Sequence, residues 1–152
     1  MTQKKKKFAV VLSGCGVYDG AEIHESVLVL LRLSQLGIDY QCVAPNVNQM
    51  HVVNHITGQE MPETRNVLVE SARIARGNVL DIAKANPADY DAVIFPGGFG
   101  AAKNLCNFAV KGAEMSLNAD VAAFARAMQA ARKPVGLICI APAMAPLLFG
   151  EG

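Results

Sequence analysis

One cysteine stands where a parallel α/β sheet would present a nucleophile. Cys139 follows the short apolar run Val135–Ile138 and precedes Ala141–Phe149, a segment predicted to begin a helix. A residue at a strand-to-helix turn sits in a strained elbow and projects from the sheet. The N-terminus of a following helix favours a thiolate there. The strict G-x-C-x-G elbow is missing, so the position alone leaves open both a nucleophile and a buried packing cysteine.

A glycine-rich loop is the second candidate for chemistry. Pro96–Gly100 follows an apolar run, and glycine there lets the backbone approach another group closely. Exposed N–H groups beside a thiolate would form an oxyanion hole, although an ordinary tight turn has the same composition. The loop lacks the spacing of G-x-G-x-x-G, and Lys103–Asn104 does not match GK[ST]. We therefore expect no nucleotide.

Carboxylates near the start of the first expected helix are the third candidate. Glu22 lies in its first turn, where a negative charge compensates the helix dipole, and we expect that role for it. Glu25 lies one step further along, on another face, and could act as an acid or base toward the cysteine. His24, between them, could serve as a base only if the geometry brought it inward.

No set of side chains predicts a metal site. His51 and His55 are four residues apart, but the residues around them predict strand or loop and not one helix face. The four cysteines form no CxxC pair. We expect no metal and no cofactor.

The elements that position these residues alternate between strand and helix. Continuous apolar strands separated by helices predict a parallel sheet covered on both faces, with ligands at the carboxyl ends of the strands. Loop 13–20, loop 96–100 and the Cys139 turn would then converge on one pocket. The expected strands are Lys7–Leu12, Asp39–Ala44, Ala92–Phe95 and Val135–Ile138. The expected helices are Glu22–Leu36, about Glu63–Ile74, a short one near Asp81, Asn118–Ala131 with Asn118 as N-cap, and the start of one at Ala141–Phe149.

Composition narrows the class of protein. The chain has 152 residues, a formal net charge of +1, 52% apolar and 18% charged residues, which excludes intrinsic disorder and argues against nucleic acid as a partner. Its length predicts one domain, 1–152. No run could cross a membrane, and the five apolar residues after Lys4–Lys7 are too few for a secretion signal. Scattered cysteines predict free thiols and a cytoplasmic location.

Together these residues resemble the PfpI/Parkinsonism-associated deglycase superfamily, which has a class I glutamine amidotransferase-like, flavodoxin-like α/β fold. Within it the chain is similar to the glyoxalase ElbB (enhancing lycopene biosynthesis) family. The resemblance covers well over a third of the chain. It is carried by SGCGVYDGAEIHE (13–25), NHITGQEMPETRNVLVESARI (54–74), PGGFGAAKNLCNFA (96–109) and GLICIAPAM (136–144).

The resemblance implies a role for each matching residue. Cys139 would be the nucleophile and Glu25 its carboxyl partner, with the amides of Gly98 and Ile140 as oxyanion donors and Gly97 and Phe99 beside the substrate. The implied activity is cofactor-independent conversion of glyoxal-type dicarbonyls to hydroxy acids through a hemithioacetal. Relatives of this kind are commonly homodimers.

Two departures from the family pattern leave alternatives open. Protease-like members carry His after the cysteine, where this chain has Ile140, which disfavours a peptidase or glutaminase. Family members also continue beyond this segment, so we expect a C-terminally truncated domain with four strands and the cysteine strand at an open edge. The alternative function is a non-catalytic redox sensor or a regulator of isoprenoid/lycopene biosynthesis.

Overall fold

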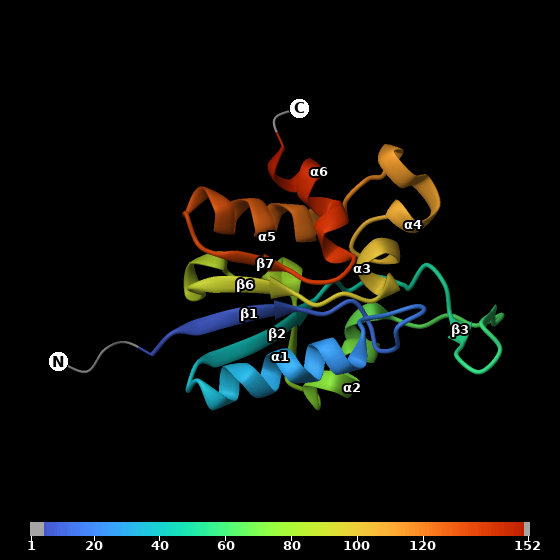
Figure 1. Ribbon diagram of the computed structural model, residues 1–152, viewed down its shortest axis with the longest axis horizontal. Helices are drawn as coiled ribbons and strands as arrows, with labels where there is room; N and C mark the ends of the chain where they lie inside the picture. Colours follow the sequence, from blue (N-terminus) through green and yellow to red (C-terminus); the bar gives the residue numbers. More distant parts are fainter. Residues whose placement is uncertain (1–4, 151–152) are drawn as a thin grey trace.

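The centre of the structure is a five-stranded parallel sheet. A computed structural model describes residues 5–150. The strand order is β5-β2-β1-β6-β7, and Phe8 of β1 pairs with both Tyr40 and Ala92. The carboxyl ends of the strands all point to one side (Figure 1). The strands are β1 (Lys7–Val11), β2 (Asp39–Ala44), β5 (Val79–Asp81), β6 (Ala92–Phe95) and β7 (Val135–Leu137).

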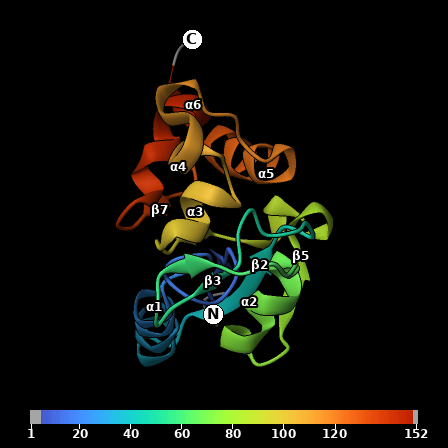
Figure 2. The same ribbon diagram turned by 90° about the vertical axis from the view of Figure 1, so that its right-hand side faces the viewer.

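Helices cover both faces of the sheet, as the flavodoxin-like expectation requires. Figures 1 and 2 show α1 and α2 on one face and α5 and α6 on the other, with α3 and α4 near the carboxyl ends of the strands. Each face has its own buried core, one around Val10 and Leu33 and one around Phe95 and Met128. The helices are α1 (Ile23–Gln35), α2 (Val67–Ala75), α3 (Phe99–Lys103), α4 (Phe108–Lys111), α5 (Ala119–Ala130) and α6 (Ala145–Phe149).

Polar caps place the helix starts. The Asn118 side chain accepts hydrogen bonds from the N–H groups of Asp120 and Val121 at 3.0 and 3.1 Å, which confirms it as the N-cap of α5. The second helix begins at Val67, later than expected, because the Asn66 side chain accepts from the Val69 N–H and caps it there.

The sequence-based strand count of four was wrong. β5 has only three residues and carries too little apolar pattern to be recognised, yet it pairs with β2 at the far edge of the sheet. The other edge is β7, as expected for the cysteine strand. A small hairpin of β3 (Val53–Asn54) and β4 (Gln59–Glu60) was also missed, and it lies beyond the carboxyl ends of the strands (Figure 1).

The segment after Cys139 is helical but divided. Ala141–Met144 forms the 3-10 helix η4, and α6 follows directly. The other 3-10 helices are η1 (Ile82–Lys84), η2 (Pro87–Asp89) and η3 (Gly112–Glu114). In residues 5–150, no helix is long and apolar enough to cross a membrane. Lys4, the last two residues and the ends of the expected 1–152 domain lie outside the described residues.

Candidate active site

Three loops meet at the carboxyl side of the sheet and enclose a small cavity. It has a volume of about 120 Å³ and an apolar interior. Loop 13–20, the start of α1, loop 96–100 and the Cys139 turn all contribute to it, as the strand-end argument predicts. The lining residues are Val17, Glu22, Gly98, Phe99, Cys139 and Ile140.

Cys139 occupies a strained turn. Its φ is +59°, and among the described non-glycine residues only Arg76 and Arg132 share a positive φ. The turn is held on both sides, since the Ile138 N–H donates to the Phe95 carbonyl and the Ala141 N–H donates to the Ile138 carbonyl, each at 3.0 Å. The thiol is exposed. A strained, exposed cysteine at a strand end fits the elbow interpretation and not the buried packing role.

The Glu25 carboxylate comes to the same place from α1. Its Oε2 accepts a hydrogen bond from the Gly97 N–H at 2.7 Å. A Cβ at Gly97 would lie 2.5 Å from Cys139 Cβ and 2.7 Å from Glu25 Oε2, so both side chains crowd one side of this glycine. Within residues 5–150 the thiol makes no hydrogen bond to Glu25. The structure therefore brings Cys139 and Glu25 close together, but it shows no hydrogen bond between the thiol and the carboxylate.

Two residues that line the cavity have backbone N–H groups with no acceptor in the described part of the chain. Loop 96–100 is pinned by three bonds: the Glu22 N–H donates to Gly97, the Phe99 N–H to Val17 and the Gly100 N–H to Gly20, at 2.8–2.9 Å. Among the described residues, the N–H groups of Gly98 and Ile140 donate to no protein atom. Both residues line the cavity beside Cys139. This arrangement could stabilise an oxyanion formed on a thiol adduct.

Glu22 has the capping role that its position predicts. Its carboxylate accepts from the Glu25 N–H at 2.7 Å and contacts His24 Nδ1 at 2.9 Å. Burial alone would raise the pKa of Glu22, but these hydrogen bonds outweigh it and hold that pKa below its usual range. The His24 side chain is 89% exposed and does not line the cavity, so the structure does not bring it into the site.

Two buried polar residues brace the site from behind. The Asn104 amide donates to the carbonyls of Ser13 and Asp19, at 2.8 and 2.9 Å, and accepts from the Met50 N–H. The Asp19 carboxylate accepts from the Val53 N–H at 2.7 Å. Asn104 thus lies behind the cavity and does not line it. The structural role of Asp19 was missed, although an acidic residue within a glycine loop was a possible signal.

The other three cysteines are poor nucleophiles. Burial raises the pKa of Cys42 to about 11 and also raises the pKa of Cys106. Burial raises the pKa of Cys15 too, while Arg73 opposes that shift. All four thiols are free, but only Cys139 is exposed.

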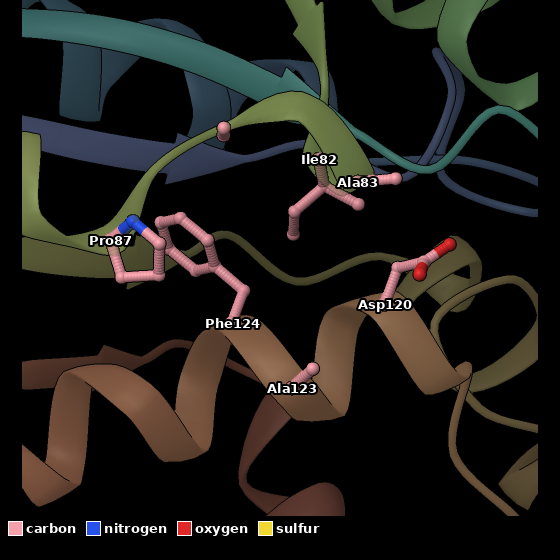
Figure 3. Close-up of a pocket in the computed structure, with 7 residues that line it drawn as sticks. Ile82, Ala83, Pro87, Asp120, Ala123 and Phe124 are labelled. Atoms are coloured by element: carbon pink, nitrogen blue, oxygen red, sulfur yellow. The ribbon is translucent and has the colours of Figure 1, made fainter.

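Other candidate sites carry less chemistry. A separate cavity of about 170 Å³ lies between α5 and the segment from Ile82 to Pro87, with Asp120 and Phe124 on its wall (Figure 3). It contains no nucleophile. Among the described residues, no three His, Cys, Asp or Glu side chains gather as a metal site.

The parallel sheet, the positive-φ turn at Cys139 and the nearby Glu25 carboxylate agree with the class I glutamine amidotransferase-like class that the sequence resembles. The chain is 54% identical over 140 residues to the human protein "Glutamine amidotransferase-like class 1 domain-containing protein 3, mitochondrial", covering 91% of this chain and 52% of that relative. It spans about half the length of the curated relatives it matches. No family model matches.

Solved structures agree with this class. An isoprenoid biosynthesis protein with an amidotransferase-like domain from Ehrlichia chaffeensis has a TM-score of 0.89 and 42% identity, over 93% of this chain and 67% of that one. Glyoxalase III from Candida albicans has a TM-score of 0.54 and 15% identity, over 91% and 58%, and thus shares the fold alone. The chain therefore belongs to the class I glutamine amidotransferase-like family.

One expectation does not fit these relatives. The human relative is named as mitochondrial, whereas free, scattered cysteines led us to expect a cytoplasmic location. Free thiols indicate only a reducing compartment, so they could not distinguish the two.

Proposed function

We propose that the site converts glyoxal-type dicarbonyls to hydroxy acids without a cofactor, with glycolate formed from glyoxal. The observation that carries the proposal is the placement of the exposed Cys139 thiol and the Glu25 carboxylate on one side of Gly97. The cavity that Cys139 lines, at about 120 Å³, suits a very small substrate. The N–H groups of Gly98 and Ile140 supply the oxyanion donors.

The reaction begins with addition of the thiolate to one aldehyde carbon. A C–S bond forms, the carbonyl π electrons move to oxygen, and the resulting hemithioacetal oxyanion is stabilised by the two N–H groups. Glu25 then removes the proton from the carbon that bears sulfur, which gives an enediolate. The same carboxyl returns a proton to the neighbouring carbon and leaves a thioester of glycolate on Cys139.

Hydrolysis completes the cycle. Water adds to the thioester, the C–S bond breaks, and glycolate leaves while Cys139 returns to its starting state. One carbon has been oxidised and its neighbour reduced, so glyoxal and water account for every atom of glycolate. The reaction needs no external oxidant or reductant, and it therefore requires no redox cofactor.

The comparisons with known proteins support the fold, whereas the proposed activity is argued from the residues of the site. The Candida albicans glyoxalase III shares the fold at 15% identity, and the more similar relatives are named for an amidotransferase-like domain and not for a dicarbonyl reaction. Because the chain spans about half of its curated relatives, the turnover of this chain alone is part of the proposal.

The test is glycolate formation from glyoxal, followed by product identification. Wild type is expected to form glycolate, and Cys139→Ala and Glu25→Gln are expected to fail. Cys15→Ala is the matched control, since Cys15 is a thiol near the same loops with a raised pKa. Turnover by Cys139→Ala would overturn the proposal. If the wild-type chain forms no glycolate, the dicarbonyl reaction is wrong for this chain, and a redox role of Cys139 becomes the better account.

We also propose that the chain forms a homodimer. Apolar residues lie exposed along α1, next to the site: Ile23, Val27, Leu28 and Leu31 are 43–60% exposed. Such a stripe is typical of a helix that packs against a partner.

A further inference from the structure

A second hollow adjoins the thiol cavity, and the proposed function does not use it. It has a volume of about 220 Å³ and is lined by Tyr18, Val53, Gly58, Phe99 and Lys103. Phe99 lines both cavities. A molecule held by its aldehyde at Cys139 could therefore extend past Phe99 into this second hollow.

The charge of this hollow comes from one side chain. Lys103 is the only charged residue among its five lining residues. The nearby carboxylate of Asp19 is buried and already accepts from the Val53 N–H, and it does not line the hollow. An anion would meet a single positive charge there.

Lys103 is positioned by its surroundings. Its Nζ donates to the Tyr18 carbonyl at 2.8 Å and lies 5.4 Å from the centre of the Phe99 ring. An ammonium group has three donors, so two remain for a ligand after the Tyr18 bond. The half-buried side chain is thereby held in place before any ligand binds, which reduces the entropy lost on binding.

The opposite wall is also ordered. The Tyr18 ring stacks on His55 with centroids 4.7 Å apart, and His55 Nε2 accepts from the Tyr18 N–H at 3.2 Å. Tyr18 and Phe99 nevertheless remain 41% and 43% exposed. Exposed rings beside an anchored cation form a surface that an organic anion can cover.

We propose that the hollow around Lys103 is an anion subsite that selects dicarbonyls carrying a carboxylate or phosphate a few bonds from the aldehyde. The inference rests on the proposed function for the aldehyde end, since Cys139 holds that end. The distal anion accepts hydrogen bonds from Lys103, and the carbon chain between the two groups lies against Phe99.

The first test measures the charge preference of Cys139 and needs no turnover. Cys139 displaces methanesulfinate from a methanethiosulfonate and forms a mixed disulfide, whose rate is followed by mass spectrometry of the Cys139 peptide. The reagents are the anionic sulfonatoethyl, the cationic trimethylammonioethyl and the neutral methyl compounds. The readout is the rate of Cys139 modification by the anionic reagent divided by the rate with the cationic reagent. We expect this ratio to be about threefold to tenfold higher for wild type than for Lys103→Met, and we expect the difference to decrease at high salt.

Matched variants separate charge from folding. Lys84→Met removes the same charge from an exposed lysine that lines neither hollow and should keep the wild-type ratio. Lys103→Arg should restore most of the ratio. An unchanged rate with the neutral reagent shows that the Cys139 turn has kept its shape. If Lys103→Met and Lys84→Met give the same ratio as wild type, the subsite does not exist.

The second test distinguishes the two anions. Dioxovalerate carries a carboxylate, the phosphate ester of hydroxypyruvaldehyde carries a phosphate, and propylglyoxal is neutral. Wild type should show a lower KM for at least one anion than for propylglyoxal, and Lys103→Met should lose that preference with propylglyoxal unaffected. An equal KM for all three overturns the subsite. Should no dicarbonyl turn over, the proposed function fails, while the charge preference of Cys139 still decides the subsite.

Discussion

At the scale of single residues, the surroundings of each thiol decide its chemistry. Four cysteines share the same side chain, yet three are wholly or partly buried and have raised pKa values. Cys139 differs because it is exposed and lies in a turn at positive φ. The backbone strain and the exposure of Cys139 are visible in the structure, whereas the residue types and their spacing in the sequence only suggest them.

The first prediction concerns the order in which the thiols react. With iodoacetamide at neutral pH, Cys139 should be modified first and Cys15 more slowly, because the reactive species is the thiolate. Cys42, whose pKa is about 11, should stay unmodified until the chain unfolds. Peptide mass spectrometry over time gives the order, and modification of Cys42 before Cys139 would show that the site is not as described.

The second prediction concerns the cap of α1. Because the folded-state pKa of Glu22 is lowered, its charged form stabilises the fold above the usual carboxyl pKa, and this stability is lost as pH falls through the folded value. Glu22→Gln should lower the free energy of unfolding by about 0.5–1 kcal/mol at pH 7. Near pH 3 the difference from wild type should shrink. Urea unfolding at pH 7 and near pH 3 measures the difference in the free energy of unfolding between the two proteins. A difference that grew in acid would contradict the capping role.

At the scale of elements, strand ends were the most predictable part of the chain. The long apolar runs fixed β1, β2, β6 and β7 to within one residue, and the rule for parallel sheets then placed their loops together. Cys139, Gly98, Phe99 and Ile140 line one cavity, whereas Glu25 and Gly97, also predicted for the site, are not among its lining residues. Local pattern is enough where an element is long or strongly apolar.

Elements defined by distant contacts could not be predicted. β5 is three residues long and exists because it pairs with β2, more than thirty residues away. Val53 of the β3–β4 hairpin donates to the distant Asp19 carboxylate, and Asn104 bonds to both Ser13 and Met50. The approach of Glu25 to Gly97 likewise spans 72 positions. Such pairings are properties of the folded chain and have no local pattern.

The third prediction tests the close approach between α1, β6 and β7. Gly97→Ala would place a Cβ against Cys139 and Glu25 and should destabilise the fold by about 1–3 kcal/mol, with glyoxal turnover lost. Gly136→Ala is the matched control, because its Cβ would make an ordinary contact of 3.6 Å with Ile94. Thermal unfolding compares the two. Equal stability of both variants would mean that Gly97 is not the crowded point.

At the scale of the whole molecule, two surfaces that begin next to the site have no partner among residues 5–150. One is the outer edge of β7, next to Cys139, and the other is the apolar stripe on α1. An open parallel edge and an exposed apolar stripe are both typical of surfaces that become covered. Cys139 follows β7 and Glu22 precedes α1, and both line the cavity, so association and activity are expected to be linked.

The fourth prediction concerns association through α1. Light scattering should give the mass of a dimer for wild type, and Leu28→Lys with Leu31→Lys should give a monomer, because each adds a charge to the apolar stripe. Val69→Lys, on α2 at 63% exposure, is the control and should remain dimeric. A wild-type monomer at micromolar concentration would contradict the homodimer.

If Cys139 and Glu25 act as one catalytic unit, as proposed, a double-variant cycle shows it most directly. Glycolate formation is measured for wild type, Cys139→Ala, Glu25→Gln and the double variant. Residues that act as a unit are strongly non-additive, so the double variant should be no slower than Cys139→Ala alone. Losses that multiply across the cycle, or a wild type that forms no glycolate, would contradict the account.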